Sequence, residues 1–149
     1  MRRRTLLLGL VFAITTASAM PAGLVIETPG PSQLQAGNLS ALPAVRYVAA
    51  YVGKPTIAYD GPLLWAVLQQ AGQPPGDMRD HAGRTVAVIG ADGYAAVLAL
   101  AEIDPGLEGK PVMLAIAADG KGLASPRLVV PGDRAPARSV RDVVRIRLN

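Results

Sequence analysis

Short apolar runs separated by turn residues constrain the fold of this chain more than any other feature. In the second half, the runs occupy residues 86–89, 94–100, 112–117, 128–130 and 140–148. Turn residues such as Ala91-Asp92-Gly93 and Ala118-Asp119-Gly120 separate them, and Asp-Gly between two apolar runs is a strong hairpin signal. Run 112–117 does not alternate, which predicts a central strand covered on both faces. Residues 145–148 alternate, which predicts a strand with one wet face.

The first half adds two expected strands and one helix. Residues 45–52 and 56–59 are rich in β-branched and aromatic side chains and predict strands. Residues 62–71 predict a helix, with Asp60 as its N-cap and Gly72 just after its end. Residues 94–103 suit a strand and a helix equally. Residues 73–83 read as a polar loop, which predicts that His81 lies at the surface. These elements predict an α+β fold with a mixed β-sheet and short helices.

The N-terminus predicts export. Arg2, Arg3 and Arg4 precede an uncharged apolar stretch, and Ala17-Ser18-Ala19 has the small-residue pattern of a cleavage site. The stretch of about 12 residues is too short for a membrane span, which needs about 20. We therefore expect a signal peptide over residues 1–19, an N-terminal extension over 20–41 and one domain over 42–149. The mature protein is expected to be periplasmic or secreted, without a membrane span, and either general or twin-arginine export remains open.

Composition excludes several functions. The chain has no cysteine and a single histidine, which excludes disulfides, thiolate metal sites, cysteine nucleophiles and histidine-rich metal sites. The formal net charge of +4 falls to about +1 when the signal arginines are removed, so the charge does not indicate nucleic-acid binding. No catalytic residue and no metal ligand is predicted.

Several short segments occur together in a characteristic order. They are residues 59–64 (YDGPLL), 70–72 (QAG), 91–94 (ADGY), 100–103 (LAEI), 119–120 (DG), 126–133 (PRLVVPGD) and 138–146 (RSVRDVVRI). In order and spacing, over roughly residues 42–148, they resemble the molybdopterin-binding domain of the sulfite-oxidase type in its small stand-alone exported form. The resemblance implies a mixed α+β fold and a molybdenum–pterin cofactor ligated by a cysteine upstream of the helix. The corresponding stretch here, about residues 45–59, has no cysteine, so we expect no molybdenum redox activity and no bound cofactor; molybdopterin is implied by the resemblance alone.

Two pairs of residues are candidates for ligand binding. Asp92 and Tyr94 could shape a pocket, because Tyr94 offers a ring face and a hydroxyl; alternatively they form only a hairpin turn. Arg134 and Arg138 lie on the connection before the last strand and are predicted to hold a phosphate or a carboxylate; alternatively they belong to a solvated basic surface.

Two functions follow from the sequence. The first is an exported, oxidoreductase-like domain without molybdenum redox activity. The alternative is a non-enzymatic periplasmic binding module for an anionic small molecule or a partner protein.

Overall fold

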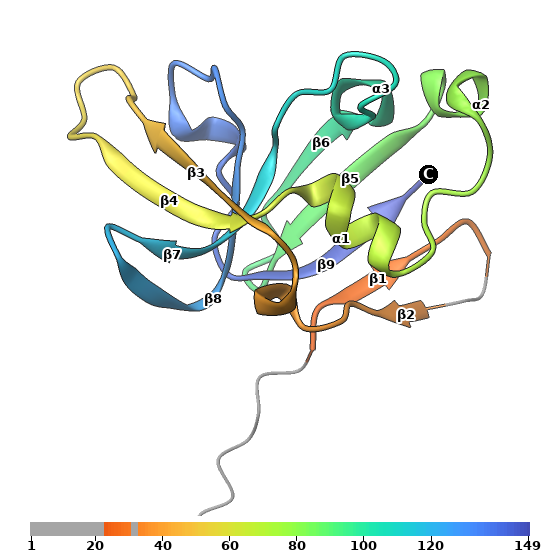
Figure 1. Cartoon of the computed structure of the whole chain (residues 1–149), viewed down its shortest axis with the longest axis horizontal. Coiled ribbons are helices and arrows are strands. Elements are labelled where there is room, and N and C mark those ends of the chain that lie inside the picture. The colour runs from red at the N-terminus through yellow and green to blue at the C-terminus, as the bar shows by residue number, and fades with distance from the viewer. Residues whose placement is uncertain (1–22, 31–32) are drawn as a thin grey trace, which may run out of the picture.

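Two β-sheets and short helices form the protein (Figure 1). The computed structural model describes residues 23–30 and 33–149; the predicted signal peptide, residues 1–19, lies outside them. The five-stranded sheet has the order β2-β1-β9-β5-β6 and the four-stranded sheet the order β3-β4-β7-β8. Strands β1 and β9 are parallel and the other pairs antiparallel, so the predicted α+β class is confirmed.

The elements have the following bounds. The strands are β1 Val25–Glu27, β2 Gln33–Gln35, β3 Ala44–Ala49, β4 Ile57–Pro62, β5 Thr85–Gly90, β6 Ala95–Ala99, β7 Met113–Ala118, β8 Lys121–Val129 and β9 Val143–Leu148. The helices are α1 Leu64–Gln70, α2 Met78–Ala82 and α3 Leu100–Ile103, with 3-10 turns η1 Leu39–Ala41 and η2 Pro136–Arg138.

Both Asp-Gly signals form hairpins, as predicted. Gly93 has a φ of +84° in the β5–β6 turn. In the β7–β8 turn, Asp119 and Gly120 both have positive φ, 49° and 76°, the backbone form that matches the twist of antiparallel strands. The ambiguous segment 94–103 divides into a strand, β6, and one helical turn, α3.

Helix α1 ends as predicted but does not begin as predicted. Gly72 has a φ of +69° directly after the C-cap Ala71, as expected of a helix-terminating glycine. The prediction that Asp60 caps the helix is wrong, because β4 extends to Pro62 and the N-cap is Leu63. Asp60 instead accepts hydrogen bonds from Arg46 across the β3–β4 pair, at 2.8 and 3.1 Å.

The chain has a large and a small hydrophobic core. The large one joins the inner face of the five-stranded sheet, α1 and alternate residues of β7 and β8. The small one lies among β3, β4, β7 and β8 and contains Tyr59 and Met113. Met113 and its neighbour Leu114 belong to different cores, so both faces of β7 are covered there. This explains why run 112–117 does not alternate.

Two regions form more structure than the sequence pattern indicates, which is a short β-like run at residues 24–26 and a loop over residues 73–83. Within the predicted N-terminal extension, β1 and β2 join the five-stranded sheet, with β1 parallel to β9. Within the predicted loop 73–83, α2 begins with a capping box: Asp77 accepts a hydrogen bond from the backbone of Asp80, and Asp80 accepts one from the backbone of Asp77. This reciprocal pairing stabilises a very short helix.

Candidate functional site

Asp92 and Tyr94 shape the β5–β6 hairpin and attach it to η2. Oδ1 of Asp92 accepts a hydrogen bond from the backbone N–H of Tyr94 at 2.9 Å. The hydroxyl of Tyr94 donates to the carbonyl of Ala137 at 2.5 Å, while the ring remains about half exposed at 52%. Of the two roles considered for these residues, the geometry supports the turn.

Arg138 is surrounded by carboxylates. Its guanidinium binds Asp133 through two hydrogen bonds, of 2.6 and 3.0 Å, and lies 3.3 Å from Glu102. Lys110 binds the same carboxylate oxygen of Glu102, Oε1, at 2.5 Å. The bond to Asp133 raises the pKa of Arg138, and the bond to Glu102 raises the pKa of Lys110. The Arg138 guanidinium is therefore already engaged by internal anions, which disfavours an incoming phosphate.

Arg134 stands apart from Arg138. It lies in the loop after β8, is exposed, and has no ion pair with any described residue. Its carbonyl accepts a hydrogen bond from the N–H of Val52 at 2.9 Å. The structure thus brings Tyr94 and Arg138 to the same short segment, η2, and leaves Arg134 on an outer loop beside the β3–β4 connection.

The stretch that corresponds to the cofactor-ligating segment of the sulfite-oxidase type is the β3–β4 hairpin. Its tyrosine hydroxyls are already bonded: that of Tyr47 accepts from the backbone of Gly132 at 3.1 Å, and that of Tyr59 accepts from Arg127 at 2.9 Å. Tyr51 is also buried, and this burial raises the pKa of its hydroxyl. With no thiol in the sequence and these side chains packed together, the hairpin does not fit a molybdenum–pterin group.

A buried histidine–aspartate pair joins α2 to the end of α3. Nδ1 of His81 donates to Oδ2 of Asp104 at 2.6 Å, and the two residues are 5% and 4% exposed. The ring of Trp65 lies edge-on to the imidazole, with centroids 5.7 Å apart. Asp104 also accepts from the N–H of Gly106, and its bond to His81 is the main cause of its lowered pKa. The prediction of a surface histidine is therefore wrong, because α2 turns His81 inward.

Nε2 of His81 is buried and has no hydrogen-bond partner in the described part of the chain. The pair resembles the base and orienting carboxylate of hydrolytic sites, but a base needs access to a substrate proton. We therefore assign the pair to holding α2 and α3 together. Nothing in the sequence pattern pairs these residues, which are 23 positions apart.

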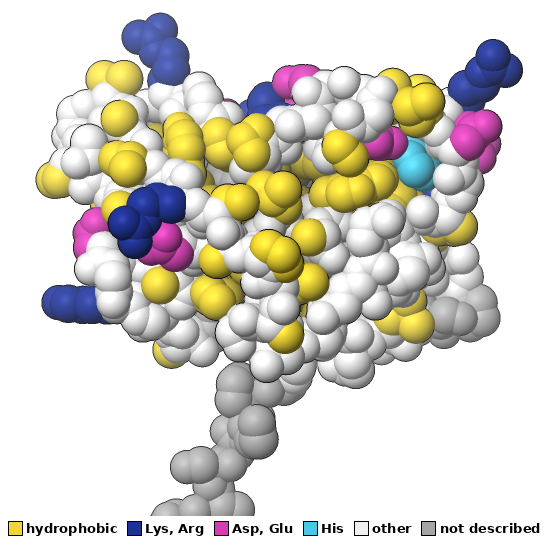
Figure 2. Space-filling model, in the orientation of Figure 1, with side chains coloured by type: hydrophobic (Ala, Val, Ile, Leu, Met, Phe, Trp, Pro, Cys, Tyr) yellow, Lys and Arg dark blue, Asp and Glu magenta, His cyan; other side chains and the backbone are white. Residues whose placement is uncertain are grey.

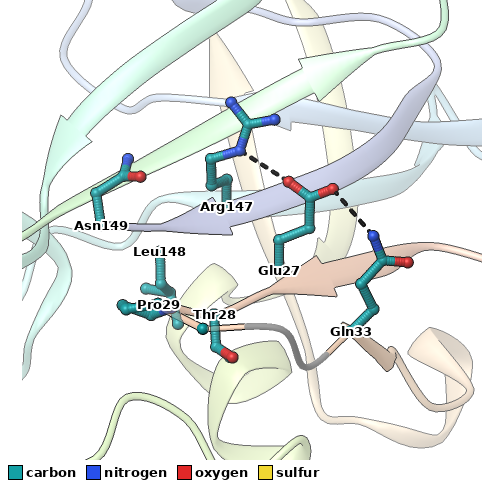
Figure 3. A pocket seen from close by; sticks show the side chains of 8 residues that line it. Glu27, Thr28, Pro29, Gln33, Arg147, Leu148 and Asn149 are labelled. Atoms are coloured by element: carbon teal, nitrogen blue, oxygen red, sulfur yellow. Dashed lines mark hydrogen bonds and ion pairs between the residues drawn. The ribbon is translucent and has the colours of Figure 1, made fainter.

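The outer face of the five-stranded sheet carries an ionic ladder. The strand register places Glu27 of β1 beside Arg147 of β9. Glu27 lies 2.7 Å from Nε of Arg147 and 3.1 Å from Nε of Arg145, and Gln33 of β2 donates to it at 3.5 Å. Figure 3 shows Arg147, Glu27 and Gln33 on one side of the sheet and Leu148 on the other. Two guanidiniums thus share one carboxylate, which leaves a net positive charge.

A small open cavity borders this ladder (Figure 3). Its volume is about 370 Å³, and its lining combines a cation, an anion, amides and a hydroxyl with apolar groups. The lining residues are Glu27, Thr28, Pro29, Gly30, Gln33, Arg147, Leu148 and Asn149.

The other half of the same face is apolar. The register pairs Arg145 with Ile89 and Arg147 with Ala87 on β5, and continues to Ala95 and Val97 on β6. Val97 is 59% exposed. Ala87, directly beside Arg147, is only 8% exposed, so the exposed apolar side chains of this face include Ala95 and Val97 on β6, where polar residues are expected if the face meets only water. We call this surface, β5 and β6 together with the arginines of β9, the outer sheet face.

Comparisons with known proteins do not identify the chain: no family model matches it, and no curated protein matches it. Within residues 23–30 and 33–149, no three His, Asp or Glu side chains gather where they could hold a metal ion. None of the helices that the structure describes has the length and apolar character needed to span a bilayer.

Proposed function

We propose that this protein is an exported, non-enzymatic binding module on an α+β scaffold similar to the sulfite-oxidase type. It lacks molybdenum redox activity and binds a partner protein that carries acidic groups. The absence of any thiolate in the sequence supports the non-redox part of the proposal. The carboxylates around Arg138 support it too, because they occupy one of the two arginines that were candidates to hold a pterin phosphate.

The observation that carries the binding role is the outer sheet face. Exposed Val97 lies in the same cross-strand row as Ala87 and Arg147. Apolar groups supply free energy when they leave water, and the surplus guanidinium charge selects an anionic counterpart. A partner with acidic side chains beside an apolar strip complements both halves of the face.

The outer sheet face favours a protein over a small molecule. Small-molecule sites are concave and enclose most of the ligand, whereas the outer sheet face runs along the neighbouring strands β9, β5 and β6. The neighbouring cavity of about 370 Å³ is lined largely by β1, β9 and the loop after β1, away from the apolar half.

Matched charge substitutions test the proposal. Val97→Glu places a carboxylate on β6, the edge strand of the sheet, in the apolar half of the outer sheet face. Val48→Glu changes a valine of similar exposure, 53% against 59%, on β3 of the other sheet. Each protein is expressed with its native signal in the organism that it comes from and is cross-linked there after export. Native mass spectrometry then shows which complexes it forms.

We expect a defined complex in the wild type and in Val48→Glu that is lost in Val97→Glu. No complex in the wild type, or equal complexes in all three proteins, would contradict the proposal. Sequencing of the exported wild type also tests the predicted cleavage, because it should begin at Met20; an intact Met1 would contradict export by this signal.

A further inference from the structure

Two loops form a convex tip at one end of the molecule, at the upper left in Figure 1. They are the β3–β4 loop, residues 50–56, and the first part of the β8–β9 loop, residues 132–136. The backbone hydrogen bond from Val52 to Arg134, 2.9 Å long, holds them together. We call the two loops the two-loop tip. Its exposed side chains are Ala50, Val52, Lys54, Pro55, Thr56, Arg134, Ala135 and Pro136.

The apolar part of the two-loop tip faces solvent. Val52 is 71% exposed, the highest value among the exposed large hydrophobic side chains of the described residues. Figure 2 shows hydrophobic side chains at this end of the molecule, below a projecting basic side chain. Val52 belongs to neither hydrophobic core, so its side chain is available for contacts outside the molecule.

The charge of the two-loop tip is positive. Lys54 and Arg134 form no ion pair with any described residue. The acid nearest to Arg134 in the chain, Asp133, is bound by Arg138. Asp119, on the neighbouring β7–β8 turn, accepts a hydrogen bond from the N–H of Ala58. Two basic side chains therefore project beside aliphatic ones without an acid bound to them.

We propose that the two-loop tip docks on the surface of a lipid bilayer that contains anionic headgroups. Lysine and arginine side chains at such a surface are attracted by its negative potential, while small aliphatic groups between them enter the headgroup region. This inference is independent of the outer sheet face, which lies on the other sheet.

Vesicle sedimentation with the mature protein tests the inference. The probes are vesicles of phosphatidylglycerol mixed with phosphatidylcholine, and vesicles of phosphatidylcholine alone. We expect binding to the anionic vesicles only, with affinity falling as salt is added. Lys54→Gln and Arg134→Gln should each weaken binding about fivefold, and Val52→Ser should weaken it as well.

Arg79→Gln is the matched control, because Arg79 is an exposed arginine on α2 at the opposite end of the long axis (Figure 1). It should bind like the wild type. Inorganic phosphate should weaken binding no more than sodium chloride at equal ionic strength, since the surface potential and not one phosphate group is recognised. Equal binding to both vesicle types, or an equal loss in Arg79→Gln and Arg134→Gln, would overturn the proposal, as would stronger competition by phosphate.

Discussion

Asp104 forms a buried pair with His81, so a substitution at Asp104 should have a measurable effect on stability. Asp104→Asn keeps the size of the side chain and can keep the bond from Gly106 to Oδ1, but it replaces an anionic acceptor by an amide. The charge-assisted bond to His81, 2.6 Å long, is lost. Because hydrogen bonds to charged groups contribute about 1.5–3 kcal/mol, we expect a loss of about 2 kcal/mol in the free energy of unfolding at pH 7.

Asp104→Ala should lose more, about 3 kcal/mol. It removes the bonds to both His81 and Gly106 and leaves their donors buried without a partner. This value is the lower end of the range for a broken buried pair. In the double variant His81→Leu with Asp104→Ala, the total loss should be smaller than the sum of the single losses, since both remove one interaction.

The difference in the free energy of unfolding between the wild type and Asp104→Asn should decrease as the pH falls. The pKa of Asp104 is lowered in the folded protein, so its contribution to stability is complete above its unfolded pKa of about 3.9. That contribution is lost as the pH falls through the lower folded pKa. Urea unfolding of both proteins, followed by circular dichroism at pH 7 and at successively lower pH, measures this. A loss below about 0.5 kcal/mol at pH 7, or a difference that persists unchanged well below pH 4, would refute the reasoning.

Three further outcomes are expected. Gly61→Ala should destabilise the fold by about 3 kcal/mol or more in the same assay, because its Cβ would lie only 2.1 Å from the carbonyl oxygen of Leu114; a change within about 0.5 kcal/mol would show that the strands can separate. Arg138→Lys should lower the melting temperature, because an ammonium group cannot reproduce the two-pronged contact with Asp133 or also reach Glu102; an unchanged melting temperature would make these bonds energetically neutral. Elemental analysis of the native exported protein should find no stoichiometric molybdenum, and finding it would mean that the pterin alone holds the metal.

Local signals in the sequence were sufficient to predict the elements whose conformation depends on residues close by in the chain. Asp-Gly at residues 92–93 and 119–120 sets hairpins because these residues adopt the backbone angles that the turns need. Gly72 ends α1 for the same kind of reason. Alternation in residues 145–148 correctly predicted one wet face, with Arg145 and Arg147 pointing into solvent. Each of these depends on interactions within a few positions of the chain.

The start of α1 shows where local reasoning fails. Asp60, Pro62 and Gly72 together predict a capped helix, but pairing with β3 and β7 extends β4 through Asp60 to Pro62. The strand conformation forms several cross-strand hydrogen bonds and buries Tyr59, whereas a helix start at Asp60 would gain a single capping bond. The strand is therefore the more stable of the two conformations. Likewise β2 is only three residues long, too short for a periodic pattern to reveal.

The candidate site depended on tertiary structure almost entirely. The sequence correctly showed that arginines gather near the C-terminus, but not which acids they meet. Arg138 meets Glu102 because η2 lies against β6 and α3, and Arg147 meets Glu27 because β1 joins the sheet beside β9. Arg134 meets no acid among the described residues, because its side chain is exposed on an outer loop. An ion pair between distant segments depends on which elements become neighbours, and that is decided by how the two sheets bury their apolar faces, not by the spacing of charges along the chain.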